Sequence, residues 1–332
     1  MAGKLRHSSH LRAFVWVTPC IAAWSLIPRL ASNTGGLDSH QYLLWSSLVS
    51  AATLMLCASV MGHAATMRAY LREDLLRLIA LASLGTFGYY ALLYSAYAPC
   101  SAGECPGKPL VIIIAQYTWP ALSVLWAALL RHERLSGRVI VSLGIGLMAV
   151  WFGASTGASS GDAVAQLPVV LLAALIFGLY STLLKRIDYE PFSSLALSFS
   201  AATLMSFVAA ACLSEKWQAP GWKGVGVWPV LVNGMLVNGL SYVCWYRALR
   251  TAPITFVMPW LALTPLIAAM FTPSHVSSDG WIGIGLVLFS VLLATLPSAA
   301  SAARSNSGSP AGTWRTRRRP CGLETAPQSR IL

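Results

Sequence analysis

This sequence contains little charge for its length. Only 10% of its 332 residues are Asp, Glu, Lys or Arg, whereas 56% are hydrophobic. A soluble domain carries about 25% charged residues, and a core of this size cannot hide so much apolar surface from water. The apolar residues run continuously and do not alternate, which excludes an outer-membrane barrel. The composition therefore predicts an all-α polytopic membrane protein, because a membrane helix pairs its backbone groups internally.

Reactive side chains are also scarce. The apolar stretches contain no Asp, Glu or Lys, and no His lies deep within one. The lone cysteines within these stretches lack the histidine partner that a nucleophilic cysteine needs. Metal ligation or acid–base chemistry would require converging His, Cys, Asp or Glu residues, and the sequence offers no such cluster. We therefore expect neither an enzyme nor a bound cofactor or metal.

Ten apolar stretches are present, and each is expected to cross the membrane as a helix. They are Phe14–Leu30, Tyr42–Met61, Leu75–Tyr94, Leu110–Leu130, Val139–Phe152, Leu167–Leu184, Phe192–Leu213, Val225–Tyr246, Thr255–Phe271 and Trp281–Leu296. Several are short, which indicates tilted helices or ends that composition alone does not locate.

Lysine and arginine gather on one side of these ten predicted spans. Of the 23 Lys and Arg residues, 19 lie in the N-terminus, the alternate loops and the C-terminal tail, and four accompany the other loops. Lys and Arg are retained on the cytoplasmic side of a membrane, whereas acidic residues contribute little to orientation. We therefore place both termini in the cytoplasm. The same orientation accounts for the net charge of +12, so no nucleic-acid partner is predicted.

The two halves of the chain share short motifs in the same order. Tyr90-Ala-Leu-Leu-Tyr94-Ser-Ala96 corresponds to Tyr242-Val-Cys-Trp-Tyr246-Arg-Ala248, 152 residues later. Trp119-Pro120 corresponds to Thr264-Pro265, and Gly144-Ile-Gly146 corresponds to Gly283-Ile-Gly285. Five spans is an odd number, so a second copy enters the membrane from the opposite face. We predict a first repeat over 1–156, a second, inverted repeat over 157–297 and a disordered basic cytoplasmic tail over 298–332.

Inverted repeats are typical of membrane transporters, in which the substrate binds near the midplane between the two copies. Rocking one copy against the other would expose that site to each side in turn. Proton-coupled carriers usually need a titratable relay inside the membrane, so the neutral spans favour facilitated diffusion. Ion binding by backbone carbonyls stays open. A membrane scaffold that transports nothing is the alternative from a different class.

A resemblance to a known family rests on the fourth and fifth predicted spans. The segment Gln116-Tyr117-Thr118-Trp119-Pro120-Ala-Leu, followed by Glu133-Arg134 and Gly144-Ile-Gly146, resembles the EamA-type repeat of the drug/metabolite transporter superfamily. The Tyr-Thr-Trp-Pro stretch is most similar to the bacterial aromatic amino-acid exporters. The resemblance covers 14–296 and implies ten helices, cytoplasmic termini and a small-molecule substrate. It also implies a multi-pass protein of the bacterial inner membrane. The second half lacks the Glu-Arg pair.

That resemblance implies a central cavity lined by the first, third, fourth, sixth, eighth and ninth spans. The candidate substrate-binding residues on these spans are Trp24, Tyr90, Tyr94, Gln116, Tyr117, Trp119, Tyr180, Asn238, Trp245 and Trp260. Aromatic rings suit an aromatic solute or its ammonium group, and amides suit the ends of a zwitterion. Trp and Tyr also form interfacial belts, which is the competing interpretation of these residues.

Prolines and asparagines mark possible moving parts of the same spans. Pro120 and Pro265 occupy matching positions, and we expect each to kink its helix, either at the binding site or simply as a bend. Asn233 and Asn238 form a polar stripe that is either a hinge or a face of the cavity. Cys100 and Cys105 share one loop on the charge-poor side and are either a disulfide or two free thiols.

These patterns predict export of aromatic or other hydrophobic amino acids by alternating access. Transport of another metabolite or a drug is the nearest alternative, although carriers of cationic drugs usually need a membrane carboxylate. The lipid bilayer and a small-molecule substrate are the only partners that the sequence indicates, and it does not indicate an oligomeric state.

Overall fold

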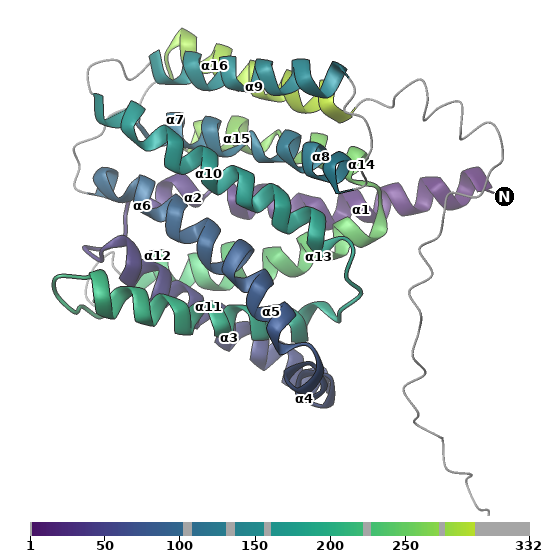
Figure 1. Ribbon diagram of the computed structural model, residues 1–332, viewed down its shortest axis with the longest axis vertical. Coiled ribbons are helices and arrows are strands. Elements are labelled where there is room, and N and C mark those ends of the chain that lie inside the picture. The colour runs from purple at the N-terminus through teal and green to yellow at the C-terminus, as the bar shows by residue number, and fades with distance from the viewer. Residues whose placement is uncertain are drawn as a thin grey trace, which may run out of the picture. The chain divides into compact units, whose positions relative to one another are not determined.

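Figure 1 shows the computed structural model, which describes residues 2–101, 108–130, 137–155, 161–221, 227–271 and 276–295. Every regular element in these ranges is a helix, and no strand occurs among them. Eight helical segments are long and apolar enough to cross a membrane. Large apolar side chains also face outward, including Trp151, which is 75% exposed. Because such side chains need hydrocarbon around them, the chain is a polytopic membrane protein.

The helices of the first half run from residue 2 to residue 155. They are α1 (Ala2–Trp24), α2 (Ile27–Ala31), α3 (Ser39–Val60), α4 (Ala64–Glu73), α5 (Leu75–Leu81), η1 (Ala82–Gly88), α6 (Tyr89–Ser101), α7 (Lys108–Gln116), α8 (Trp119–Leu129) and α9 (Gly137–Ser155). Those of the second half are α10 (Gly161–Leu184), α11 (Pro191–Leu213), α12 (Val227–Val232), η2 (Asn233–Leu240), α13 (Ser241–Thr251), α14 (Ile254–Leu261), α15 (Thr264–Met270) and α16 (Ser278–Thr295).

The predicted spans coincide with these helices. The segments of full spanning length are Ser9–Ala31, Ser39–Val60, Leu75–Pro99, Pro109–Leu129, Ala165–Leu184, Pro191–Leu213, Val227–Thr251 and Ser278–Thr295. The predicted fifth and ninth spans coincide with two shorter apolar segments, Gly137–Gly153 and Phe256–Met270. All ten predicted ranges are therefore mainly helical where the structure describes them, but three of them are interrupted by a turn and two fall short of a full span in length.

Acidic caps fix where two of the long helices begin. Asp38 accepts hydrogen bonds from the backbone nitrogens of His40 and Gln41, both at 2.9 Å, at the start of α3. Glu190 accepts from the backbone nitrogens of Phe192 and Ser193, at 3.0 and 2.6 Å, at the start of α11. These bonds satisfy first-turn N–H groups that have no partner within the helix.

Pro120 and Pro265 each lie just after a two-residue break between helices. α7 ends at Gln116, and α8 begins at Trp119 with Pro120 as its second residue. α14 ends at Leu261, and α15 begins at Thr264 with Pro265 second. Proline lacks the N–H that would continue the hydrogen-bond ladder. The breaks, at 117–118 and 262–263, lie 145 residues apart, which is also the spacing of the two prolines.

A third break separates α1 from α2, where Pro28 is again the second residue of the new helix. The helix predicted to match it in the second half, α10, runs unbroken from Gly161 to Leu184 although it contains Pro168. The two halves therefore differ at this point.

Two segments of π-helix, η1 and η2, occur just before α6 and α13. In η1 the backbone nitrogen of Tyr89 bonds to the carbonyl of Leu84, five residues earlier, and in η2 that of Ser241 bonds to the carbonyl of Leu236. Such insertions are rare and occur often at functional sites. Asn233 and Asn238 both lie in η2, so the polar stripe of the sequence is a π-helical segment.

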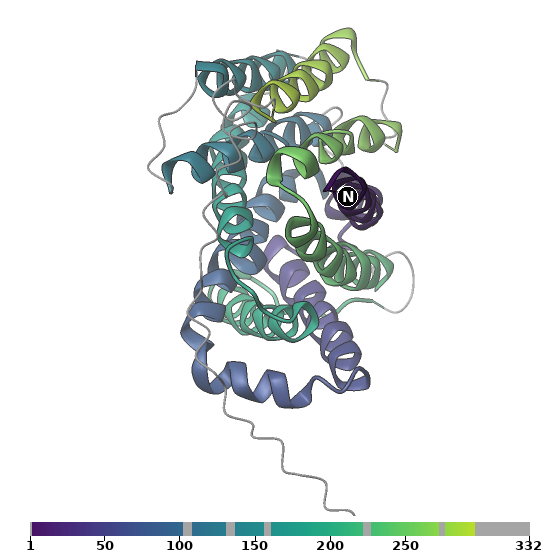
Figure 2. The same ribbon diagram turned by 90° about the vertical axis from the view of Figure 1, so that its right-hand side faces the viewer.

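Helices from the two halves pack against each other. α3 packs along α11, and α9 packs along α16 (Figure 1). α1, seen end-on in Figure 2, packs against α13 and α14, while α10 packs against α6, α7 and α8. The described residues up to 295 form one unit. The predicted basic tail, 298–332, lies outside the described residues.

Candidate functional site

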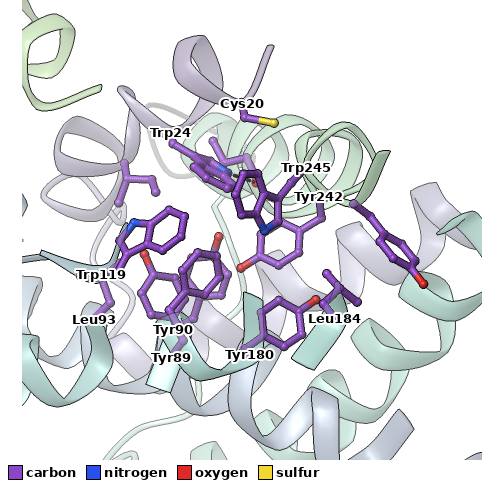
Figure 3. Packing of buried hydrophobic residues seen from close by; sticks show 14 of the residues in the cluster. Cys20, Trp24, Tyr89, Tyr90, Leu93, Trp119, Tyr180, Leu184, Tyr242 and Trp245 are labelled. Atoms are coloured by element: carbon purple, nitrogen blue, oxygen red, sulfur yellow. Dashed lines mark hydrogen bonds between the residues drawn. The ribbon is translucent and has the colours of Figure 1, made fainter. Parts of the chain in front are cut away.

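Nine aromatic side chains gather in the interior of the helical unit, and Figure 3 shows Trp24, Trp119 and Trp245 among them. They are Trp24, Tyr89, Tyr90, Tyr94, Trp119, Phe177, Tyr180, Tyr242 and Trp245, and each is at most 3% exposed. They come from α1, α6, α8, α10 and α13, so both halves of the chain contribute. We call this group the central cluster.

Edge-on packing holds the middle of the central cluster together. The ring of Trp119 lies 4.7 Å from that of Phe177 and 5.5 Å from that of Trp245, with both pairs of planes at 86°. Trp24 lies 5.7 Å from Trp245, also edge-on. Such pairs contribute about 0.5–1.5 kcal/mol each beyond the burial of their surface. Each ring is therefore held in a defined orientation by its neighbours.

Amide side chains adjoin the cluster on two sides. From η2, Asn233 Nδ2 donates to Tyr94 Oη at 2.6 Å, and Tyr94 Oη lies 3.5 Å from the acceptor Asn238 Oδ1. From the end of α7, Gln116 donates through Nε2 to Tyr89 Oη. The break after α7 and the π-helical segment before α13 thus both present an amide to the same group of rings.

Three polar atoms at this site have no hydrogen-bond partner among the described residues. They are Gln116 Oε1, Asn238 Nδ2 and Trp245 Nε1, and all three side chains are at most 1% exposed. By contrast, Trp24 Nε1 donates to Ser241 Oγ at 2.8 Å. An unpaired buried polar atom costs about 1–3 kcal/mol. One free acceptor and two free donors are what a bound polar molecule could satisfy.

Most of the predicted site residues lie together. Trp24, Tyr90, Tyr94, Trp119, Tyr180 and Trp245 belong to the central cluster, and Gln116 and Asn238 are hydrogen-bonded to it. Pro120 directly follows Trp119, whereas Pro265 follows Thr264 at the other break.

Two predicted residues lie elsewhere. Tyr117 is buried in a second apolar cluster, which includes Ile113 of α7 and Ile284 of α16. Trp260 is half-buried, and its ring contacts Phe14 at 4.7 Å. The proposed pair of Cys100 and Cys105 lies outside the residues whose side chains are described.

Phe177 occupies the middle of the central cluster although no sequence motif singled it out. Its ring contacts those of Trp24, Trp119 and Tyr242, and it stacks on Tyr89 at 4.3 Å. Phe177 precedes Tyr180 by three residues on α10 and so shares its helical face. That spacing was the signal that could have identified it.

The central cluster contains no acidic, basic or histidine side chain. Among the residues that the structure describes, no three His, Cys, Asp or Glu side chains lie together in an arrangement that could hold a metal ion. The chemistry that this arrangement offers is binding, through ring faces, ring edges and neutral hydrogen-bonding groups.

Two comparisons concern overall likeness to known proteins. The chain is 34% identical to the uncharacterized protein PA1977 of Pseudomonas aeruginosa over 163 residues, which are 49% of this chain. The match spans about half, 53%, of the length of that curated relative. A protein of known crystal structure superimposes with a TM-score of 0.63 at 18% identity, over 90% of this chain and 99% of the other. That likeness concerns the fold alone.

A third comparison concerns a family. Residues 166–296 match the EamA-like transporter family. These residues include α11 to α16 and most of α10, and hence the second-half contribution to the central cluster. The match to a transporter family agrees with the multiple apolar helices of the chain. Over residues 166–296 this multi-span membrane protein is thus similar to the EamA-like transporter family.

Proposed function

We propose that this protein exports aromatic or other hydrophobic amino acids across the bacterial inner membrane. The substrate would bind at the central cluster, and alternating access between the two halves would carry it across. The observation that carries this proposal is the combination of packed rings with three unpartnered polar atoms at the same buried site. Rings from both halves would enclose an apolar or aromatic side chain.

The polar atoms suit the two ends of a zwitterion. Gln116 Oε1 would accept a hydrogen bond from the ammonium group, and a ring face would attract the same charge. Asn238 Nδ2 and Trp245 Nε1 would donate to the carboxylate. No fixed charge is needed in this arrangement, so the site would take a molecule whose own charges cancel.

The paired helix features support an inverted repeat over 1–156 and 157–297. The breaks at 117–118 and 262–263 lie at matching positions, and η1 and η2 precede matching motifs. The helix packing also fits an inverted repeat. α1 of the first half packs on α13 and α14 of the second half, and α10 of the second half packs on α6, α7 and α8 of the first half. In an inverted duplication, each of these two sets of contacts is the counterpart of the other. Paired interruptions of this kind accompany midplane substrate sites in transporters.

We further propose facilitated diffusion with both termini on the cytoplasmic side. The central cluster holds no group that would exchange a proton near neutral pH, which a proton-coupled carrier usually requires. The Lys and Arg bias of the loops supports the orientation.

Thermal unfolding of the purified protein in detergent tests the substrate class. We expect phenylalanine, tryptophan or leucine to raise the Tm, and aspartate or lysine to leave it unchanged, because a ligand at about 100 times its Kd stabilises by roughly 2.7 kcal/mol. If no amino acid shifts the Tm but another metabolite does, the proposed substrate is wrong and that metabolite takes its place.

Trp245→Phe tests the assigned contact within the same screen. The variant keeps a ring but removes the free Nε1–H, and a lost hydrogen bond to a charged group costs roughly 1.5–3 kcal/mol. We therefore expect the apparent affinity to fall by about tenfold or more. Trp151→Phe is the matched control, because Trp151 lies on α9 and is 75% exposed. Equal effects of the two substitutions would refute the assignment.

A further inference from the structure

The last turn of α13 is held by the connection between α10 and α11. Lys185 Nζ donates to the carbonyl oxygens of Leu249 and Ala252, at 2.6 and 2.7 Å. Carbonyls at the end of a helix have no partner within it, and the helix dipole favours a cation there. Lys185 therefore ties the end of α10 to the end of α13.

Two side chains of α13 reach the same connection. Tyr246 Oη accepts from the backbone nitrogen of Tyr189 and donates to the carbonyl of Ile187, both at 2.8 Å. Arg250 Nη1 donates to the carbonyl of Tyr189 at 3.1 Å, and Nη2 pairs with Asp188. We call Lys185 and residues 187–190, together with Tyr246 and Arg250, the latch.

The latch also contacts the first half of the chain. The backbone nitrogen of Glu190 donates to Tyr70 Oη of α4 at 2.8 Å, and the rings of Tyr70 and Tyr189 lie 4.8 Å apart. The Arg247 guanidinium of α13 lies 4.8 Å from the ring of Trp16 in α1. Residues of α1 and α4 thus contact α13 and the connection that follows α10. All of these contacts lie at the Lys/Arg-rich ends of their helices.

At its other end α13 follows η2, the π-helical segment. A π-helical turn contains one more residue than an α-helical turn, so its hydrogen bonds have an alternative pairing, and such insertions are a recognised cause of helix bending. Tyr242 and Trp245 of the central cluster both lie on α13, and Trp245 directly precedes the latch residue Tyr246. A swing of α13 about η2 would therefore release the latch and move two rings of the cluster together.

We propose that the latch closes the substrate site toward the Lys/Arg-rich face, and that α13 swings about η2 when this face opens. This gate rests on the proposed transport function, because it controls access to the same site. The structure shows the latched state, with α13 held by contacts from both halves.

Alkylation of native cysteines tests the latch without any substrate. Cys20 is fully buried where α1 meets α13, and its Sγ donates to the carbonyl of Ser241 at 3.2 Å (Figure 3). Cys212 is exposed and provides an internal reference for complete labelling. N-ethylmaleimide would be added to the purified full chain, and mass spectrometry of peptides would follow the labelling of each thiol.

We expect Lys185→Met to speed labelling of Cys20 relative to Cys212 by about tenfold, because labelling follows the population of the open form. Tyr246→Phe is a second, milder variant that keeps the ring and removes only the bridging hydroxyl, and it should act in the same direction. Arg186→Met is the matched control. Arg186 is exposed in the same connection, and no hydrogen bond of its side chain is found among the described residues.

Faster labelling in Lys185→Met and Tyr246→Phe, with Arg186→Met like the wild type, supports the latch. Unchanged labelling in both latch variants, or an equal rise in Arg186→Met, overturns it. Retention of the wild-type elution volume on gel filtration shows that a variant remains folded. If the latch variants speed Cys20 labelling but the protein transports no amino acid, the latch is supported and the proposed substrate is rejected. The two proposals can therefore fail separately.

Discussion

A single methyl group at Gly85 is expected to disturb the central cluster. A Cβ on Gly85 would lie 2.4 Å from Cγ and Cδ2 of the Tyr180 ring. Carbon atoms pack favourably at about 3.5–4.0 Å, so the ring would have to move by about 1 Å. Tyr180 is 1% exposed, and its ring neighbours Phe177 at 5.7 Å and Tyr242 at 6.3 Å. We expect Gly85→Ala to destabilise the protein by ~1–3 kcal/mol, as overpacking does elsewhere.

Gly144→Ala supplies the matched control for this prediction. A Cβ on Gly144, in α9, would meet nothing within 4 Å, and replacing glycine by alanine in a helix stabilises by about 0.5–1 kcal/mol. Thermal unfolding in detergent should therefore give a lower Tm for Gly85→Ala and a slightly higher one for Gly144→Ala. Equal shifts of Tm in the two variants would refute the close packing of Gly85 against the Tyr180 ring.

A double variant tests whether the clash with Tyr180 causes the loss of stability expected for Gly85→Ala. Tyr180→Ala removes the ring that the new methyl group meets. If the clash is the mechanism, Gly85→Ala should cost less in the Tyr180→Ala background than in the wild type, and additive effects would point to another cause.

Two further predictions concern named hydrogen bonds. Tyr94→Phe leaves Asn233 Nδ2 buried without its 2.6 Å acceptor, so it should cost ~1–3 kcal/mol. Tyr42→Phe removes only a 3.4 Å bond and should lower the Tm less; the reverse order would contradict the assignment. For Glu190, burial alone raises the pKa, but the hydrogen bonds from Ser193 and Phe192 and the neighbouring His63 outweigh it and lower the pKa overall. A lowered carboxyl pKa stabilises the fold above the unfolded pKa of about 4.3, and the contribution disappears as the pH falls through the lower folded value. The Tm difference between wild type and Glu190→Gln should therefore be largest above about pH 5 and shrink in acid; a difference that is constant from pH 3 to pH 7 would count against this role.

The helices could be predicted from the sequence more fully than their irregularities. Continuous apolar runs locate a membrane helix by composition alone, and proline removes a specific N–H, so the interruptions at Pro120 and Pro265 were predictable. The π-helical segments were not, since their formation depends on distant contacts. A Cβ on Gly234 in η2 would lie 2.5 Å from Val49 of α3, and nothing near Gly234 in the sequence indicates that approach.

Membership of the candidate site could be predicted where residue type and helical face agree. Trp119 and Trp245 lie in the central cluster as expected, and Phe177 was overlooked because an apolar ring in an apolar span resembles ordinary packing. Tyr117 was expected to line the cavity, but it is buried in the second apolar cluster. Trp260 lies on a predicted cavity helix, yet its ring packs on Phe14. Which way a side chain points after a break depends on the tertiary fold.

Counterflow in reconstituted vesicles tests the proposed transport most directly. Vesicles loaded with unlabelled phenylalanine would be diluted into labelled phenylalanine, and a second series would use threonine. We predict uptake above that of empty liposomes for the wild type and for Trp151→Ala, and loss of most of that uptake for Trp119→Ala at equal protein content. Uptake of both amino acids equal to that of empty liposomes would contradict the proposed function.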